Sequence, residues 1–312
     1  MTRCRNEVGG EHTQPHGPTA QRLHLVCTAA RRVLFPIVSL VVFATAGTAQ
    51  ASSPANRENE GFWARWFRRS DHSKAGQPHW LTPLATTTPR LEQEVRYDVN
   101  WSQPKPGGPY TETYGNTKGL ELIPVERIEI IAAIPAYIVH NNPATKDGWG
   151  DFQLLVKYRL LSANEEHGNY ILTAFVSSTF PSASYGNGQP KAIITPTLAY
   201  GKGWGAFDMQ GTIGAAEPAG NTSSIGRTYT WNHTFQLHAL SKIWPELEIN
   251  RSWFSGGKND GKEQTFVTPG VVIGRTRITD RVGFTFGAGV QIAVSQFQTS
   301  DHNIILSMRA PF

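Results

Sequence analysis

The sequence predicts a closed antiparallel transmembrane β-barrel of about 12 strands. Three observations predict it: long segments in which apolar and polar residues alternate, connections that alternate in length, and an alternating final segment that ends in Phe312. Successive side chains of a strand point to opposite faces of its sheet. Each alternating segment would therefore have one apolar face for lipid and one polar face for the interior of a barrel.

The composition fits this fold class. The chain has 312 residues, of which 39% are hydrophobic and 17% charged, and its mean hydropathy is −0.34. Soluble domains usually have roughly 25% charged residues. A multi-helix membrane protein would be far more apolar, whereas a barrel hides its apolar residues by alternating them with polar ones.

Residues 1–51 have the parts of a secretory signal peptide. An apolar run from Val33 to Ala46 follows Arg31 and Arg32, and small residues occupy positions 49 and 51. The run is short of the roughly 20 residues that cross a bilayer. We expect cleavage after residue 51. The stretch before the apolar run is unusually long for a signal peptide, and a true start codon downstream of Met1 would explain it. An uncleaved N-terminal anchor is the alternative.

Cleavage there would remove both cysteines, Cys4 and Cys27. The mature chain would then have no disulfide, no thiolate metal site and no cysteine nucleophile. Residues 1–51 carry five basic and two acidic residues, so the formal charge of +5 falls to +2. No basic stripe with interleaved aromatic residues is present, so we expect no nucleic-acid partner.

Residues 52–90 show no strand alternation. We predict a periplasmic N-terminal segment, partly disordered, with a short amphipathic helix near 60–70. The helix has arginines opposite aromatic residues at helical spacing, as a helix that lies on an anionic membrane surface does. A disordered linker is the alternative. The aromatic residues are Phe62, Trp63, Trp66 and Phe67.

Residues 91–312 alternate to the end and form the predicted barrel. The segments have roughly 10 residues, as a tilted membrane strand requires, whereas sandwich strands usually have about 5–6. Their number is even, as single-chain bacterial barrels require. The predicted strands start near Leu91, Lys118, Arg127, Gly150, Asn169, Lys191, Gly205, Gly226, Pro245, Gln264, Arg281 and His302.

The connections alternate between short turns and longer loops rich in Gly, Asn, Pro and Ser. Barrels of the outer membrane place short turns in the periplasm and long loops outside the cell. The strand at Leu91 should pair with the strand at His302 to close the barrel, with both chain ends in the periplasm. Several Trp and Tyr residues lie near segment ends, where a membrane interface would favour them.

The C-terminal segment is the sharpest local signal. Ile304, Leu306, Met308, Ala310 and Phe312 share one face of the last predicted strand. An alternating strand that ends in Phe resembles the assembly signal of outer-membrane barrels. We therefore expect the barrel assembly machinery and outer-membrane lipids as partners.

Seven stretches carry a resemblance to a known family. They are Glu121–Pro124, Leu155–Glu166, Ile194–Leu198, Gly201–Gly205, Trp244–Glu248, Thr268–Gly270 and Asp280–Gly283. With them, residues 83–312 resemble the outer-membrane proteins grouped under a "MetA-pathway of phenol degradation". The resemblance implies an outer-membrane barrel of the transporter type and a link to aromatic catabolism. It brings no site residues.

Alternation assigns a set of charged side chains of both signs to the lumen. These charges either pair across a narrow, largely filled barrel or line a water-filled path that selects solutes by charge. A barrel of about 12 strands permits either arrangement. The predicted lumen residues are Glu92, Glu94, Arg96, Asp98, Arg127, Glu129, Lys157, Arg159, Asp208, Glu246, Glu248 and Arg309.

We expect a channel that passes small molecules, including aromatic or other hydrophobic compounds, in or out across the outer membrane. A structural envelope barrel without transport is the first alternative. A membrane-embedded hydrolase is the second, but the mature chain has no G-x-S-x-G motif, and His233 falls on the apolar face. We therefore expect no enzyme activity, no cofactor and no metal.

Overall fold

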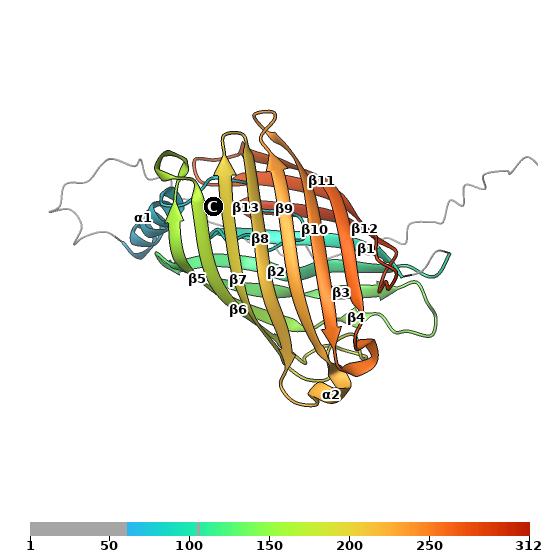
Figure 1. The fold of residues 1–312 in the computed structure, drawn as a ribbon. Helices are drawn as coiled ribbons and strands as arrows, with labels where there is room; N and C mark the ends of the chain where they lie inside the picture. The colour runs from blue at the N-terminus through green and yellow to red at the C-terminus, as the bar shows by residue number, and fades with distance from the viewer. Residues whose placement is uncertain (1–60, 105–106) are drawn as a thin grey trace, which may run out of the picture. The chain divides into compact units, whose positions relative to one another are not determined.

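A computed structural model of the chain describes residues 61–104 and 107–312. The predicted signal peptide and residues 52–60 lie outside the described residues. Thirteen strands form one sheet, and β4 (Gly148–Trp149) is a two-residue strand that pairs only with β3. The other twelve pair in a ring, each antiparallel to both of its neighbours (Figure 1).

The ring closes between the first strand and the last. Glu94 lies opposite Pro311 and Gln103 opposite His302. The predicted closed antiparallel barrel of about 12 strands is thereby confirmed. The strands are β1 (Glu94–Gln103), β2 (Thr111–Val125), β3 (Ile128–His140), β5 (Phe152–Ala163), β6 (Tyr170–Phe180), β7 (Ile193–Trp204), β8 (Phe207–Pro218), β9 (Arg227–Leu237), β10 (Ile243–Ser255), β11 (Glu263–Arg277), β12 (Gly283–Ala293) and β13 (His302–Pro311).

Ten of the twelve strands start within two residues of the predicted positions, and two strand starts differ by more. The first strand begins at Glu94 instead of Leu91, and β2 begins at Thr111 instead of Lys118. The pairing of β2 with β3 shifts register between Tyr114 and Gly119. Such bulges interrupt the period of two that marks a strand in a sequence. Alternation therefore revealed only the second part of β2.

Short and long connections lie at opposite ends of the barrel. The short-turn end has the connections at 126–127, 164–169, 205–206, 238–242 and 278–282. The long-loop end has those at 104–110, 141–151, 181–192, 219–226, 256–262 and 294–301. Short helices lie within three of these connections: η2 (Glu165–His167), α2 (Thr222–Ile225) and η3 (Gly257–Asn259). Strand β1 starts and β13 ends at the short-turn end.

The outer face of the barrel is apolar. Large hydrophobic side chains between 37% and 51% exposed recur on ten of the strands: Ile130, Val156, Val176, Leu198, Ile213, Trp231, Leu247, Ile273, Phe286 and Leu306. A continuous apolar belt of this kind is unusual in contact with water. It matches the lipid-facing band of a membrane barrel, in which apolar residues point outward from every strand.

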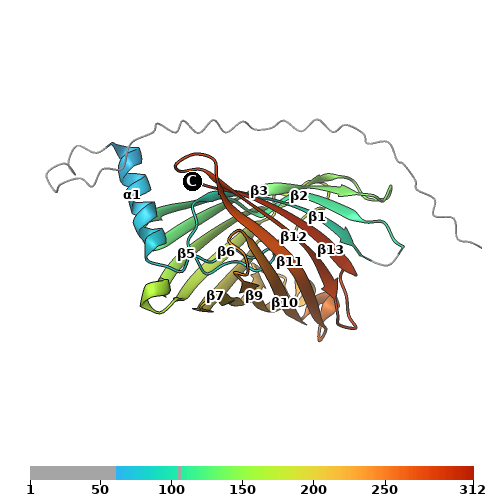
Figure 2. The same ribbon diagram turned by 90° about the horizontal axis from the view of Figure 1, so that it is seen from above.

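Helix α1 (Phe62–Ala75) lies at the short-turn end, beside the C-terminus (Figure 2). Ser73 Oγ donates to the carbonyl oxygen of Glu126 at 2.6 Å, and Lys74 Nζ donates to that of Phe312 at 3.1 Å. Burial lowers the pKa of Lys74 below its ordinary value. The helix is longer than the one predicted near 60–70. No helix in residues 61–104 and 107–312 has the length and apolar character to cross a bilayer.

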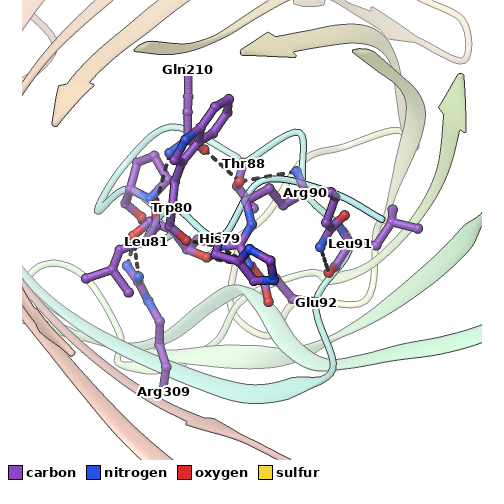
Figure 3. A network of polar contacts seen from close by, with 12 residues as sticks. His79, Trp80, Leu81, Thr88, Arg90, Leu91, Glu92, Gln210 and Arg309 are labelled. Atoms are coloured by element: carbon purple, nitrogen blue, oxygen red, sulfur yellow. Dashed lines mark hydrogen bonds and ion pairs between the residues drawn. The ribbon is translucent and has the colours of Figure 1, made fainter. Parts of the chain in front are cut away.

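Residues 77–93, called the inner segment below, run inside the barrel. Trp80, Leu84 and Leu91 are at most 2% exposed, and Figure 3 shows the segment within the surrounding strands. Residues 52–90 were predicted to lie in the periplasm ahead of the barrel, whereas residues 77–90 lie inside it. The inner segment has no regular secondary structure, so no period in the sequence indicates its burial.

Candidate functional site

Two carboxylates of β10 bind the tip of the inner segment. Glu246 Oε1 accepts the backbone N–H of Leu84 at 3.1 Å, and the two oxygens of Glu248 accept those of Ala85 and Thr86, each at 2.7 Å. Both side chains point inward because they are two residues apart on one strand, and Leu247 between them points outward. Glu246 and Glu248 are called the carboxylate latch below.

Two arginines bind the carbonyl oxygens of the same tip. Arg96 donates to the carbonyl oxygen of Pro83 at 3.1 Å and to that of Leu84 at 2.5 Å. Arg309 donates to Pro83 at 2.8 Å and also to Thr82. The tip thus presents N–H groups to anions and carbonyl oxygens to cations. These bonds satisfy backbone groups that would otherwise be costly to bury.

One ion pair of the opposite wall holds the returning part of the inner segment. Lys157 and Glu129 form a pair with 3.0 Å between Nζ and Oε1, and both side chains are at most 1% exposed. Lys157 Nζ also donates to the carbonyl oxygen of Arg90 at 3.1 Å. Glu129 Oε2 accepts the N–H of Glu92 at 2.7 Å. This pair therefore joins β3, β5 and the inner segment.

Gln77 clamps the two ends of the inner segment together. Its amide donates to the carbonyl oxygen of Leu91 at 2.8 Å and accepts the N–H of the same residue at 2.9 Å. The segment therefore enters and leaves at the short-turn end. There Glu165 accepts the N–H of His79 at 2.6 Å. Burial raises the pKa of Glu165, but its hydrogen bonds with His79 outweigh burial and lower that pKa below its usual value.

Glycines of the wall make room for the apolar side chains of the segment. A Cβ atom on Gly287 would lie 2.4 Å from Leu84 Cδ2, and one on Gly270 would lie 2.6 Å from Leu84 Cδ1. A Cβ on Gly201 would lie 2.5 Å from the Trp80 ring. Side chains at these positions would occupy the volume of the segment. The wall is therefore shaped to hold it.

Gly287→Val should displace the tip of the inner segment, because the new side chain would overlap Leu84. The backbone at Gly270 and Gly289 lies close to the other side of Leu84, so this side chain has no space to move into. Overpacking of this kind costs about 1–3 kcal/mol. We expect a lower heat-denaturation temperature for the detergent-solubilised protein and recovery when Leu84→Ala is added. Gly283→Val in the same strand is the control, since the nearest atom to its added Cβ, the carbonyl oxygen of Thr276, is 3.4 Å away, an ordinary contact distance. An equal fall of the heat-denaturation temperature in both valine variants would contradict the packing of Leu84 against Gly287.

The structure buries eleven of the twelve predicted lumen residues within the barrel. They are Glu92, Glu94, Arg96, Asp98, Glu129, Lys157, Arg159, Asp208, Glu246, Glu248 and Arg309. Arg127 is an exception. It is exposed in the two-residue turn between β2 and β3, because a turn residue does not continue the alternation of either strand. Asp208 bonds to His238 at 2.8 Å, and hydrogen bonds through Gln210 and Gln236 connect it to Glu246 of the latch.

Sequence reasoning missed several interior residues. Glu121 and Lys118 of β2 are 2% and 8% exposed, and the register shifts of that strand concealed them. Trp80 and Arg90 belong to the non-periodic inner segment. Gln210 carried a signal, since it follows Asp208 by two residues on β8, and it bonds to both Thr88 and Leu81. Because its side chain is uncharged, it was not among the predicted lumen residues.

A cavity of about 320 Å³ lies against the tip of the inner segment, toward the long-loop end. It is lined by Leu84, Ala85, Asp98, Asn100, Lys118, Gln291, Asn303 and Ile305. It is called the lumenal cavity below. Among residues 61–104 and 107–312, no group of three or more His, Cys, Asp or Glu side chains is placed to hold a metal ion.

Comparison with known proteins finds likeness in structure. The crystal structure of the COG4313 outer membrane channel from Pseudomonas putida F1 is similar with a TM-score of 0.52 at 15% sequence identity, covering 75% of this chain and 100% of that chain. The NanC porin structure aligns with a TM-score of 0.45 at 10% identity, covering 69% and 98%. The first likeness is one of fold. No family model and no curated protein matches the sequence.

Proposed function

We propose that the chain forms an outer-membrane channel for small molecules that its own inner segment closes. The observation that carries the proposal is that the inner segment, and not the side chains of the wall, obstructs the passage through the barrel. A structural barrel of this size could be filled by the side chains of its wall, but here the wall has glycines where the segment lies. Single hydrogen bonds and ion pairs hold the segment, and these break and re-form without strand rearrangement.

The proposed location follows from the apolar belt and the chain ends. A cleaved signal peptide at 1–51 would export the chain, and Phe312 would serve as the signal for the barrel assembly machinery. The short-turn end would face the periplasm and the long-loop end the outside of the cell. The inner segment would then close the channel from the periplasmic side. The resemblance of residues 83–312 to outer-membrane transporters supports the same assignment.

The polar interior favours hydrophilic solutes over the aromatic compounds that the family label suggests. The charged side chains of the wall and the backbone of the inner segment line the path through the barrel. An aromatic solute would have to remove water from these groups, which is costly unless it replaces their hydrogen bonds. We therefore propose hydrophilic solutes of low molecular mass as the cargo.

Removing residues 52–90 tests the channel function directly. We expect the full-length barrel to conduct weakly in planar lipid bilayers and the truncated barrel to conduct steadily at a several-fold higher level. Truncation removes most of the inner segment and leaves every strand of the ring. Heat-modifiable mobility in gel electrophoresis would show that the truncated barrel is folded. A folded truncated barrel that conducts no better than the full-length one would indicate a structural barrel.

A further inference from the structure

A row of side-chain amides follows the inner wall of the barrel, and Gln291 and Asn303 of this row line the lumenal cavity. Asn303 Nδ2 donates to Gln291 Oε1 at 2.7 Å, and Gln291 Nε2 donates to Asn250 Oδ1 at 3.2 Å. Asn250 Nδ2 then donates to Asn232 at 3.2 Å and to Thr86 Oγ1 at 3.1 Å. Strands β13, β12, β10 and β9 each contribute one member. The bond from Asn250 to Thr86 connects the row to the tip of the inner segment.

Amides suit a partner that both donates and accepts hydrogen bonds. Each has two N–H donors and a carbonyl oxygen with two lone pairs. Among the described residues, the row uses one N–H of Asn303 and leaves its carbonyl oxygen beside the cavity. Asn100 faces the same space from β1. Hydroxyl groups, which also donate and accept, match such a wall.

Charges of both signs border the same cavity. The carboxylate of Asp98 is bound by Arg96, with 2.9 Å between Oδ2 and Nη2, and the ammonium group of Lys118 lies on the neighbouring strand β2. An anionic solute would meet Asp98, and a cationic solute would meet Lys118. An uncharged solute avoids both repulsions.

The volume and the apolar lining of the cavity further restrict the class of solute that fits. About 320 Å³ is at the lower bound of ligand pockets, which are roughly 300–1,000 Å³. Leu84 and Ile305 supply apolar surface at this site. A monosaccharide has hydroxyl groups around its ring edge and C–H groups on its ring faces. Its groups therefore match the amide wall and the apolar surface.

We propose that the lumenal cavity is a binding site for an uncharged, hydroxyl-rich solute of monosaccharide size. The inference rests on the proposed channel function and names the class of solute that such a channel would take. The site includes the tip of the inner segment, through Leu84 and Ala85. A solute bound there therefore contacts the segment that closes the passage.

Saturation-transfer difference NMR on the detergent-solubilised full-length barrel tests the site. The probe is methyl α-D-glucopyranoside, and gluconate, glucosamine and benzyl alcohol are the anionic, cationic and aromatic comparisons. We expect saturable binding of the glucoside at about millimolar concentration, and weaker signals from the other three. Empty micelles give the background for benzyl alcohol. Stronger binding of a charged or aromatic probe would overturn the proposal.

Replacement of the amides tests where the sugar binds. Asn100→Leu and Gln291→Leu should each weaken glucoside binding about fivefold, as the loss of one hydrogen bond does. Gln298→Leu makes the same change at an exposed loop amide and should bind as the unaltered protein does. Asn100 lies outside the amide row, so its replacement keeps the proposal testable if Gln291→Leu fails to fold. Equal binding by all variants would overturn the proposed site.

Conductance of the same preparations separates this inference from the channel function. A barrel that conducts after truncation but never binds the glucoside contradicts the solute site alone. A barrel that binds the glucoside but conducts neither before nor after truncation contradicts the channel and leaves the site in place.

Discussion

The double variant Glu246→Ala/Glu248→Ala, which lacks both latch carboxylates, is expected to conduct steadily, whereas the unaltered barrel conducts weakly. The tip of the inner segment would lose three acceptors for its backbone N–H groups. Hydrogen bonds to charged groups are each worth about 1.5–3 kcal/mol. A change of 1.4 kcal/mol alters an equilibrium about tenfold. The population with the tip displaced should therefore rise at least about tenfold, measured as open time in planar bilayers.

A graded series distinguishes the latch from general damage. Glu248→Gln keeps one neutral acceptor oxygen, so its open time should lie between those of the unaltered barrel and Glu248→Ala. Glu263→Ala removes an exposed carboxylate of β11 that pairs with Arg251, and it should leave open time unchanged. If every variant is folded and none has a longer open time than the unaltered barrel, the two carboxylates do not keep the channel closed.

Lys157→Met is expected to lower the stability of the barrel more than any other single charge removal in the wall. It leaves Glu129, which is fully buried, without its cation, and it removes the donor to the carbonyl oxygen of Arg90. Breaking one partner of a buried ion pair costs about 3–5 kcal/mol. The measurement is the heat-denaturation midpoint of the detergent-solubilised protein, followed by circular dichroism.

Two further variants show whether the buried charge is the cause. Adding Glu129→Gln to Lys157→Met removes the stranded carboxylate and should restore part of the lost stability. Arg227→Ala breaks a pair with Glu217 whose side chains are 44% and 40% exposed. Exposed pairs contribute about 0–1 kcal/mol, so this midpoint should hardly move. A loss in Arg227→Ala as large as that in Lys157→Met would refute the argument from burial.

The strands were predictable because their physics is local. A period of two is visible within ten residues, and it predicted β10 and the inward direction of Glu246 and Glu248. The inner segment was not predictable, because its burial depends on partners far away in the sequence. Leu84 bonds to Glu246, 162 residues later, and only the closed barrel brings the two together.

The sequence therefore predicted the charged residues of the wall but not their binding to the inner segment. Alternation placed Arg96 and Arg309 inside, and it suggested that the charges pair with one another or face water. In the structure Arg96 does pair with Asp98, but both arginines also bind carbonyl oxygens of the inner segment. A single sequence contains no signal for this, because backbone carbonyl groups are the same at every residue.

The bond between Arg309 and the carbonyl oxygen of Pro83 joins residues 226 positions apart. Arg309 lies on β13, the strand that completes the ring, so this bond forms only when the last strand reaches its place. The order of folding follows from this. Contacts so distant in the chain form late, and the step that joins β13 to β1 also brings Arg309 to the segment inside. We therefore expect the step that closes the wall to seal the barrel as well, so that assembly leaves no open hole in the membrane.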